Sequence, residues 1–202
     1  AATFARRELR GGLRGFRVFL ACLALGVAAI AAVGTVRAGI EAGLAEQGSA
    51  LLGGDTQATL TYRYATDVEL AFMRDVSTTL SETVDFRSMV VVGDDRALTQ
   101  VRAVDDAYPL VGNVTLDPLI PLPDALAGNG TLPGGVMERV LADRLGLTPG
   151  ETFRMGTQDF VLSAVLANYP DNGAGGFSLG PRSIVLTRDL ANAGLLSEGT
   201  LF

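Results

Sequence analysis

The chain has 202 residues and a formal net charge of −6, and this charge is divided unevenly along its length. Residues 1–17 carry a net charge of +4 and residues 18–202 a net charge of −10, which argues against nucleic acid as a partner because its phosphates would be repelled. The sequence has no histidine, no lysine and one cysteine, Cys22. It therefore has no disulfide of its own, no ordinary zinc or transition-metal site and no Ser–His or Cys–His nucleophile pair, which weakens every enzyme interpretation.

Residues 1–17 form a basic leader, which we expect to lie as an amphipathic helix on the inner surface of an anionic membrane. Its positive charge also predicts how a following membrane segment is oriented. The arginines that we expect to set this topology are Arg6, Arg7, Arg10, Arg14 and Arg17.

Residues 18–36, from Val18 to Val36, are predicted to span a membrane. They contain no charge, and nine of the 19 are Val, Leu, Ile or Phe. As a helix this run is about 28 Å long, close to the ~30 Å hydrocarbon core of a bilayer. Its large apolar residues favour insertion by roughly 3–5 kcal/mol in total on a biological insertion scale.

Five arginines precede the span and Arg37 follows it, so the tendency of positive charge to stay inside predicts a cytoplasmic N-terminus and an exported C-terminal part. The competing interpretation is a cleaved signal peptide, because residues 29–31 (AIA) resemble a cleavage site. Apolar residues continue to Val36, and helical patterning continues beyond it, which favours the uncleaved span.

Residues 37–52 are predicted to continue the span as a helical stalk, in which Ile40 and Leu44 share one face. Small residues recur at four-residue spacing along the span and the stalk, a pattern that lets helices approach closely in bilayers. An alanine-rich composition explains the same pattern without any contact. The candidate helix-packing residues are Ala24, Ala28, Ala32, Gly39 and Gly43.

The first part of the exported region, residues 53–108, is predicted to be a small α+β subdomain. Alternating residues indicate a half-buried strand at 56–64. A capping box, in which Thr66 is the N-cap and Glu69 lies three residues later, starts a helix. We expect the ridge of this helix to face the core. That ridge consists of Val68, Phe72, Val76 and Leu80. Two strands at 86–92 and 97–104 should pair as a hairpin.

Residues 109–133 are rich in proline and glycine and are interpreted as an irregular crossing to a second subdomain, residues 134–202. This second unit is expected to contain a helix at 138–147 and further strands. The predicted strands are a short one near Val136 and others at 151–156, 159–167 and 182–187, before a last helix at 188–196. The overall fold class is therefore α+β: one transmembrane helix with a stalk, then a mixed periplasmic domain of two small α/β subdomains.

The sequence contains only weak candidates for catalytic or ligand-binding motifs. Asp105 and Asp106 are adjacent on an extended chain, so their side chains point to opposite faces and make a poor acid–base pair. The glycine-rich loop at 170–181 lacks the lysine of a phosphate-binding loop and is interpreted as a mobile surface loop. Its candidate contact residues are Gly173, Gly175, Gly176 and Phe177.

Several strings, taken in order, resemble bacterial ABC transporter permeases of the FtsX-like and MacB-like kind. Residues 5–10 (ARRELR) precede the span, and residues 53–55 (GGD) follow the stalk. Residues 101–110 (VRAVDDAYPL) resemble a strand and turn of the periplasmic core domain in these permeases. Residues 141–147 (LADRLGL) with 149–151 (PGE) resemble its later helix–turn–strand. The most similar branch consists of large permeases predicted to act in lysophospholipase biosynthesis or lipid export.

This resemblance implies a non-enzymatic permease segment in the bacterial inner membrane. It implies three kinds of partner: a cytoplasmic ATPase that binds ATP and Mg, a second permease half or protomer, and a lipid, lipoprotein or other hydrophobic cargo. The later membrane helices and the ATPase-binding loop of such permeases have no counterpart here, so we expect the chain to be the first helix and first periplasmic domain.

Two rival functions stay open at this stage. A membrane-anchored sensor domain would precede a second span and a signalling module, and a secreted or anchored hydrolase is disfavoured by the missing histidine.

Overall fold

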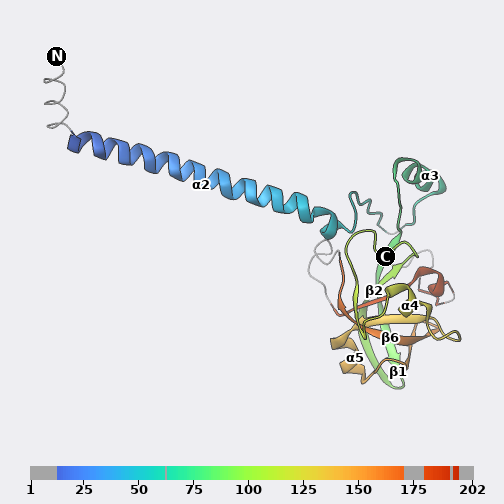
Figure 1. The fold of residues 1–202 in the computed structure, drawn as a ribbon. Helices are drawn as coiled ribbons and strands as arrows, with labels where there is room; N and C mark the ends of the chain where they lie inside the picture. The colour runs from blue at the N-terminus through green and yellow to red at the C-terminus, as the bar shows by residue number, and fades with distance from the viewer. Residues whose placement is uncertain (1–12, 62, 171–179, 192, 196–202) are drawn as a thin grey trace, which may run out of the picture. The chain divides into compact units, whose positions relative to one another are not determined.

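The computed structural model describes residues 13–61, 63–170, 180–191 and 193–195 (Figure 1). The chain separates into two compact units, residues 1–48 and 49–202. The first unit contains most of the long helix α2 (Leu13–Leu52), which runs without interruption through the predicted span and stalk. The expected continuation of the span as a helix is thus confirmed.

The second unit is built on one mixed sheet of seven strands, in the order β3-β6-β4-β7-β2-β1-β5. Strand β5 pairs with both β1 and β6, so the sheet closes on itself, and β3 is added beside β6. The strands are β1 (Thr83–Val92), β2 (Asp95–Val104), β3 (Thr115–Asp117), β4 (Gly134–Glu138), β5 (Thr152–Met155), β6 (Gln158–Asn168) and β7 (Arg182–Leu186).

Four short helices accompany these strands: α3 (Asp67–Val76), α4 (Leu122–Ala127), α5 (Arg139–Leu145) and the 3-10 helix η1 (Thr187–Leu190). Helix α5 packs into a core on one face of the sheet, together with Phe153, Phe160 and Met155. Helix α4 packs into a second core on the other face, together with Val136 and Ile184. The close contact of α4 with the sheet requires a glycine, because a Cβ at Gly134 would lie 2.0 Å from the carbonyl oxygen of Ala125.

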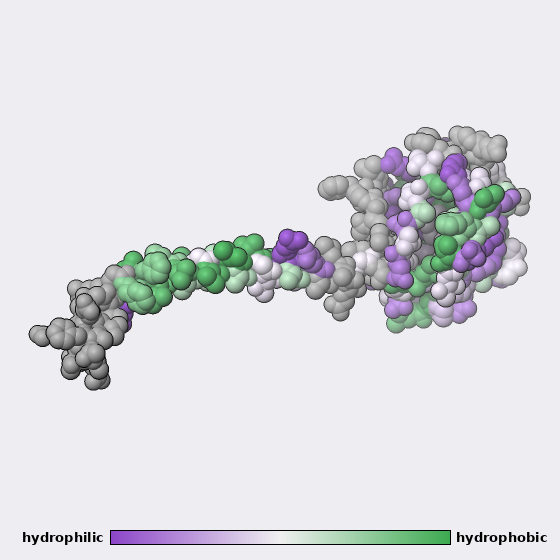
Figure 2. Space-filling model, turned by 90° about the horizontal axis from the view of Figure 1, so that it is seen from above, coloured by the Kyte–Doolittle hydropathy of each residue, from purple (hydrophilic) through white to green (hydrophobic). Residues whose placement is uncertain are grey.

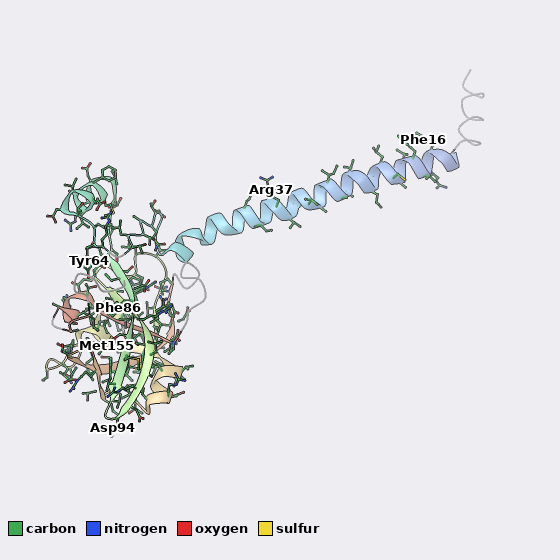
Figure 3. All side chains as sticks on the ribbon, turned by 180° about the vertical axis from the view of Figure 1, so that it is seen from behind. Phe16, Arg37, Tyr64, Phe86, Asp94 and Met155 are labelled. Atoms are coloured by element: carbon green, nitrogen blue, oxygen red, sulfur yellow. The ribbon has the colours of Figure 1, made fainter. Side chains whose placement is uncertain are left out.

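The predicted hairpin is confirmed. Val92 pairs with Asp95 across a two-residue turn, and the pairing continues to Thr83 and Val104 at the other end. Gly93 supplies the positive φ, +57°, that this type of turn needs. Asp94 marks the tip of the hairpin in Figure 3.

The mixed α/β character of the domain is confirmed, but its expected division into subdomains 53–108 and 134–202 is wrong. Strand β2 pairs in parallel with β7, and β1 pairs with β5, so strands from both predicted subdomains lie side by side. The predicted crossing 109–133 contains β3 and α4, which pack on the same sheet. Proline and glycine there mark turns within one domain rather than a boundary between two.

Two further expectations need correction. Residues 56–61 and 63–64 form no strand, and most of their side chains are exposed. The alternation that predicted this strand reports only side-chain character, and none of these residues takes part in the strand pairing of the sheet. The last predicted helix, 188–196, is only the short η1 within the described residues.

The interleaved core predicts that the seven-stranded sheet and the helices α4 and α5 packed on it unfold as one cooperative unit. Phe153 is 2% exposed, and its ring stacks on Phe160 with centroids 5.6 Å apart. We expect Phe153→Ala to lower the free energy of unfolding by about 3–5 kcal/mol, because it leaves a cavity in the core. Urea unfolding of the full chain in detergent, followed by circular dichroism, measures this change.

The matched control is Leu119→Ala, at a side chain that is 85% exposed, which should change stability by no more than about 0.5 kcal/mol. Separate transitions for the hairpin and for the rest of the sheet would contradict a single unit.

Candidate membrane segment and exposed helical surface

Helix α2 presents an apolar surface that nothing within the described chain covers. Residues 16–41 are all exposed, and the stretch Phe16–Glu41 has the length and composition to cross a membrane, with none of it buried. The predicted span 18–36 lies inside this stretch. In Figure 2 apolar side chains cover this part of the helix.

Aromatic and charged residues lie at the two ends of this apolar stretch. The rings of Phe16 and Phe19 stack with centroids 6.5 Å apart, next to exposed Arg17. At the other end Arg37 and Glu41 form an exposed ion pair at 2.7 Å, one helical turn apart. Such a pair adds only about 0.3–0.5 kcal/mol to helix stability. Its position shows where the uncharged segment of the helix ends.

The predicted packing residues face outward, without a partner in the described chain. Ala24, Ala28, Ala32 and Gly39 are exposed, and a Cβ added at Gly39 or Gly43 would meet no atom within 4 Å. Helix packing through these residues stays a prediction.

The other predicted residues are only partly described. Arg14 and Arg17 lie in the first turns of α2. Two groups lie outside the described residues: Arg6, Arg7 and Arg10 in the leader, and Gly173, Gly175, Gly176 and Phe177 in the glycine-rich loop.

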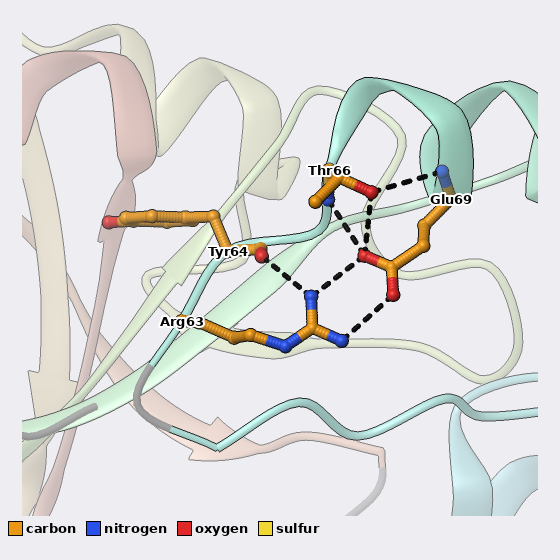
Figure 4. A network of polar contacts seen from close by, with 4 residues as sticks. All are labelled: Arg63, Tyr64, Thr66 and Glu69. Carbon is orange, nitrogen blue, oxygen red and sulfur yellow. Dashed lines mark hydrogen bonds and ion pairs between the residues drawn. The ribbon is translucent and has the colours of Figure 1, made fainter.

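Helix α3 begins with a capping network that holds its first turn (Figure 4). The Glu69 carboxylate accepts hydrogen bonds from the Thr66 backbone N–H at 2.8 Å and from both terminal nitrogens of Arg63 at 2.7 and 2.8 Å. The Glu69 N–H in turn donates to the Thr66 hydroxyl. These hydrogen bonds lower the pKa of Glu69 to about 2, and the interaction with Arg63 has the largest effect. The predicted capping box is confirmed.

The ridge of α3 is not part of the core, contrary to expectation. None of the residues in α3 is buried, and Val68, Phe72 and Val76 are 79%, 65% and 65% exposed. The amphipathic pattern correctly indicated a helix with one apolar face, but such a pattern does not say whether the covering partner is in the same chain. A large apolar ridge left in water is a candidate interaction surface.

The polar centre of the domain, which sequence reasoning missed, is a pair of buried arginines. Arg102 donates two hydrogen bonds to Asp85, at 2.9 and 2.6 Å, and its neighbour Arg182 lies 3.9 Å from the same carboxylate. The Arg182 guanidinium lies over the ring of Tyr169, 5.1 Å from its centroid. The sequence did carry a signal for this pair, because Arg102 lies within the apolar run at 101–104. A buried arginine in a strand requires an acidic partner.

The candidate carboxylate pair has a structural role. Asp105 accepts hydrogen bonds from the Ser81 hydroxyl and the Glu82 N–H, both at 2.7 Å, while Asp106 pairs with Arg188. The two carboxylates serve different contacts and share no site. Among the described residues there is no cluster of ligands that would hold a metal ion.

Comparison with known proteins finds a relative among bacterial ABC transporter permeases. The chain is 27% identical, over 183 residues, to the uncharacterized ABC transporter permease YbbP of Escherichia coli strain K12. This chain is related to bacterial ABC transporter permeases. The match covers 88% of the chain but only 21% of YbbP, so the chain spans about a fifth of that permease. No protein-family model matches the chain.

Two solved structures of extracytoplasmic domains are also similar. The extracellular domain of the noncanonic ABC-type transporter YknZ from Gram-positive bacteria gives a TM-score of 0.47 at 14% identity, over 64% of this chain and 66% of that one. The periplasmic region of MacB from Actinobacillus actinomycetemcomitans gives 0.43 at 13% identity, over 67% and 60%.

The capping network predicts that the stability of helix α3 depends on pH. The pKa of Glu69 is lowered in the folded chain, so its stabilising effect is present above the ordinary carboxyl pKa of 4.5 and is lost as the pH falls toward 2. We expect Thr66→Ala to speed amide hydrogen exchange in α3 by roughly 2- to 30-fold at neutral pH, the range that corresponds to an N-cap loss of about 0.5–2 kcal/mol.

Thr78→Ala, at an exposed residue beyond the end of α3, is the matched control and should leave exchange unchanged. Equal exchange in both variants would mean that the network does not hold the helix.

Proposed function

We propose that this chain belongs to the membrane-spanning subunit of a bacterial ABC transporter. The observation that carries the proposal is the similarity to a permease over 88% of the chain, which includes an exposed apolar helix of membrane-spanning length. In this proposal the subunit itself is not an enzyme, and a separate cytoplasmic ATPase binds ATP and Mg.

The proposed location is the inner membrane, with the N-terminus in the cytoplasm and residues 53–202 in the periplasm. The asymmetry of arginine around residues 18–36 supports this orientation. A second permease half or protomer is the proposed partner within the membrane, as the resemblance of the sequence to such permeases implies.

Helix α2 gives the proposal a mechanical element. Its 40 residues extend about 60 Å, roughly twice the thickness of the hydrocarbon core. A single helix that continues beyond the bilayer transmits tilting or rotation from the membrane to whatever follows it. We infer that ATP-driven movement of the membrane helices reaches the periplasmic domain along this route.

The proposed cargo is a lipid, a lipoprotein or another hydrophobic molecule. The support for it is the resemblance of the sequence to large lipid-export permeases, together with the exposed apolar side chains of α3. In this proposal the domain takes part in moving the cargo.

Interrupting α2 beyond the apolar run tests this coupling. We expect Ala38→Pro in the intact gene product, purified with its ATPase, to lower ATPase activity at least threefold. Proline removes a backbone hydrogen bond and clashes within a helix, at a cost of roughly 3 kcal/mol, so the helix kinks or breaks there. Ala38→Ser, at the same exposed residue, is the control and should retain the activity of the unmodified protein.

Failure of the intact product to co-purify with any ATPase would contradict the transporter assignment. Equal activity of the proline and serine variants would contradict the mechanical role of α2 alone.

A further inference from the structure

Strand β1 has one edge that is only partly paired. Along its whole length, from Thr83 to Val92, β1 pairs with β2. On the opposite edge, within the part of the chain that the structure describes, it pairs only through Val90 and Val91, with β5. Residues 83–88 therefore have an open edge on that side, which we call the β1 edge.

The hairpin turn determines which backbone groups of β1 point to this edge. Val92 and Asp95 close a two-residue turn, so they form a hydrogen-bonded pair, and such pairs alternate along an antiparallel ladder. The N–H and C=O groups of Thr83, Asp85 and Arg87 therefore point away from β2. These three residues are exposed, and their backbone groups make no hydrogen bond with any described residue.

Groups of this kind select a polypeptide as their partner. Along a strand edge they recur at every second residue, a spacing of roughly 7 Å, and an extended backbone offers complementary groups at the same spacing. A lipid acyl chain has no hydrogen-bonding groups to offer. An exposed edge also invites pairing with other molecules, so native proteins pair it, cover it or place charges on it.

The side chains of the β1 edge indicate what kind of strand fits beside it. On the inner face Phe86 is buried, but Val84 is only half-buried against the same core. On the outer face Asp85 is paired with Arg102, whereas Arg87 is exposed and forms no ion pair with a described residue. A suitable strand has apolar residues for the inner face and an acidic residue near Arg87.

The chain itself passes beside one end of the β1 edge. Gly156 directly follows β5, the strand that pairs with β1. The Thr157 N–H donates a hydrogen bond to the Ala193 carbonyl at 3.2 Å, and a Cβ at Gly156 would lie 2.9 Å from Cγ of Leu195. Leu195 packs against the same core as Val84. The chain that continues from Leu195 therefore starts close to the β1 edge.

We propose that the segment that begins at residue 196 pairs as an extended strand with the β1 edge. It would lie in line with β5 and, like β5, run antiparallel to β1. Its sequence at 196–202, LSEGTLF, supplies apolar side chains and, in Glu198, an acidic partner for Arg87. Because the segment belongs to the same polypeptide, its effective concentration at the edge is high and no second molecule is needed.

This pairing has a consequence for the proposed transporter. A strand at the β1 edge would join the part of the protein that follows the domain to the same sheet, so a movement on that side would also reach the sheet. This consequence rests on the proposed function. The pairing itself does not, and it is tested without any measurement of transport.

Hydrogen exchange at single backbone amides tests the pairing in the intact gene product, purified alone in detergent. We expect the amides of Asp85 and Arg87 to exchange roughly tenfold or more slowly than that of Leu119, after correction for intrinsic rates, because a hydrogen-bonded amide exchanges only when its bond opens. Leu119 is 85% exposed and is the reference for an open position. Phe86, whose N–H points to β2, is the reference for a protected one.

A matched pair of variants at residue 87 isolates the backbone contribution. Arg87→Pro removes an N–H that points to the β1 edge and leaves the bonds to β2 in place. In this variant the Asp85 amide should exchange roughly tenfold faster, whereas Arg87→Ala keeps the N–H and should keep exchange slow. Slow exchange at Phe86 in both variants shows that the hairpin is still folded.

Cross-linking identifies the segment. In intact protein whose native cysteines, Cys22 among them, are replaced by serine, we introduce Arg87→Cys together with Glu198→Cys. We expect a disulfide within single, diluted copies to form roughly tenfold faster than with the matched pair Arg96→Cys and Glu198→Cys, because the two Cα atoms must lie within about 7 Å. Arg96 is also exposed but lies on β2, away from the β1 edge.

Three results would overturn the proposal. The first is exchange at Asp85 and Arg87 that is as fast as at Leu119. The second is slow exchange that is lost on dilution, which would mean that another molecule supplies the strand. The third is equal cross-linking of residue 198 with residues 87 and 96, which would mean that a different segment covers the edge.

Discussion

A long apolar helix whose side chains are exposed is unfavourable in water. Residues 16–41 of α2 have no cover within the described chain, and their uncharged centre favours transfer into a bilayer by several kcal/mol. In the proposed topology, the arginines of residues 1–17 keep the N-terminus in the cytoplasm. The proposed periplasmic location of the acidic domain follows from this topology.

The domain after the helix is built as one body around a single sheet. Its sheet joins strands from the beginning and the end of the domain, and helices α5 and α4 fill the cores on its two faces. The buried pair of Arg102 and Arg182 around Asp85 ties three of these strands together at their polar centre. A displacement of one strand would therefore move the whole sheet rather than one subdomain.

Local patterns predicted local structure well and long-range structure poorly. The uncharged run, the capping box at Thr66, the hairpin turn at Gly93 and the helix after Glu138 all follow from spacing and turn chemistry within a few residues. The division into two subdomains failed because the parallel pairing of β2 with β7 joins residues about 80 positions apart, and no local periodicity encodes that pairing. The prediction that Phe72 lies in the core was wrong for a related reason, because the sequence of an amphipathic helix does not reveal which molecule covers its apolar face.

Extraction of the intact gene product from membranes tests whether residues 18–36 anchor the protein. We expect the protein to stay in the membrane pellet after washing with alkaline carbonate and with high salt, and to keep its residues from 18 to 36. Release into the supernatant, or a mature protein trimmed after Ala31, would show that the helix is not an anchor and would remove the basis of the transporter assignment.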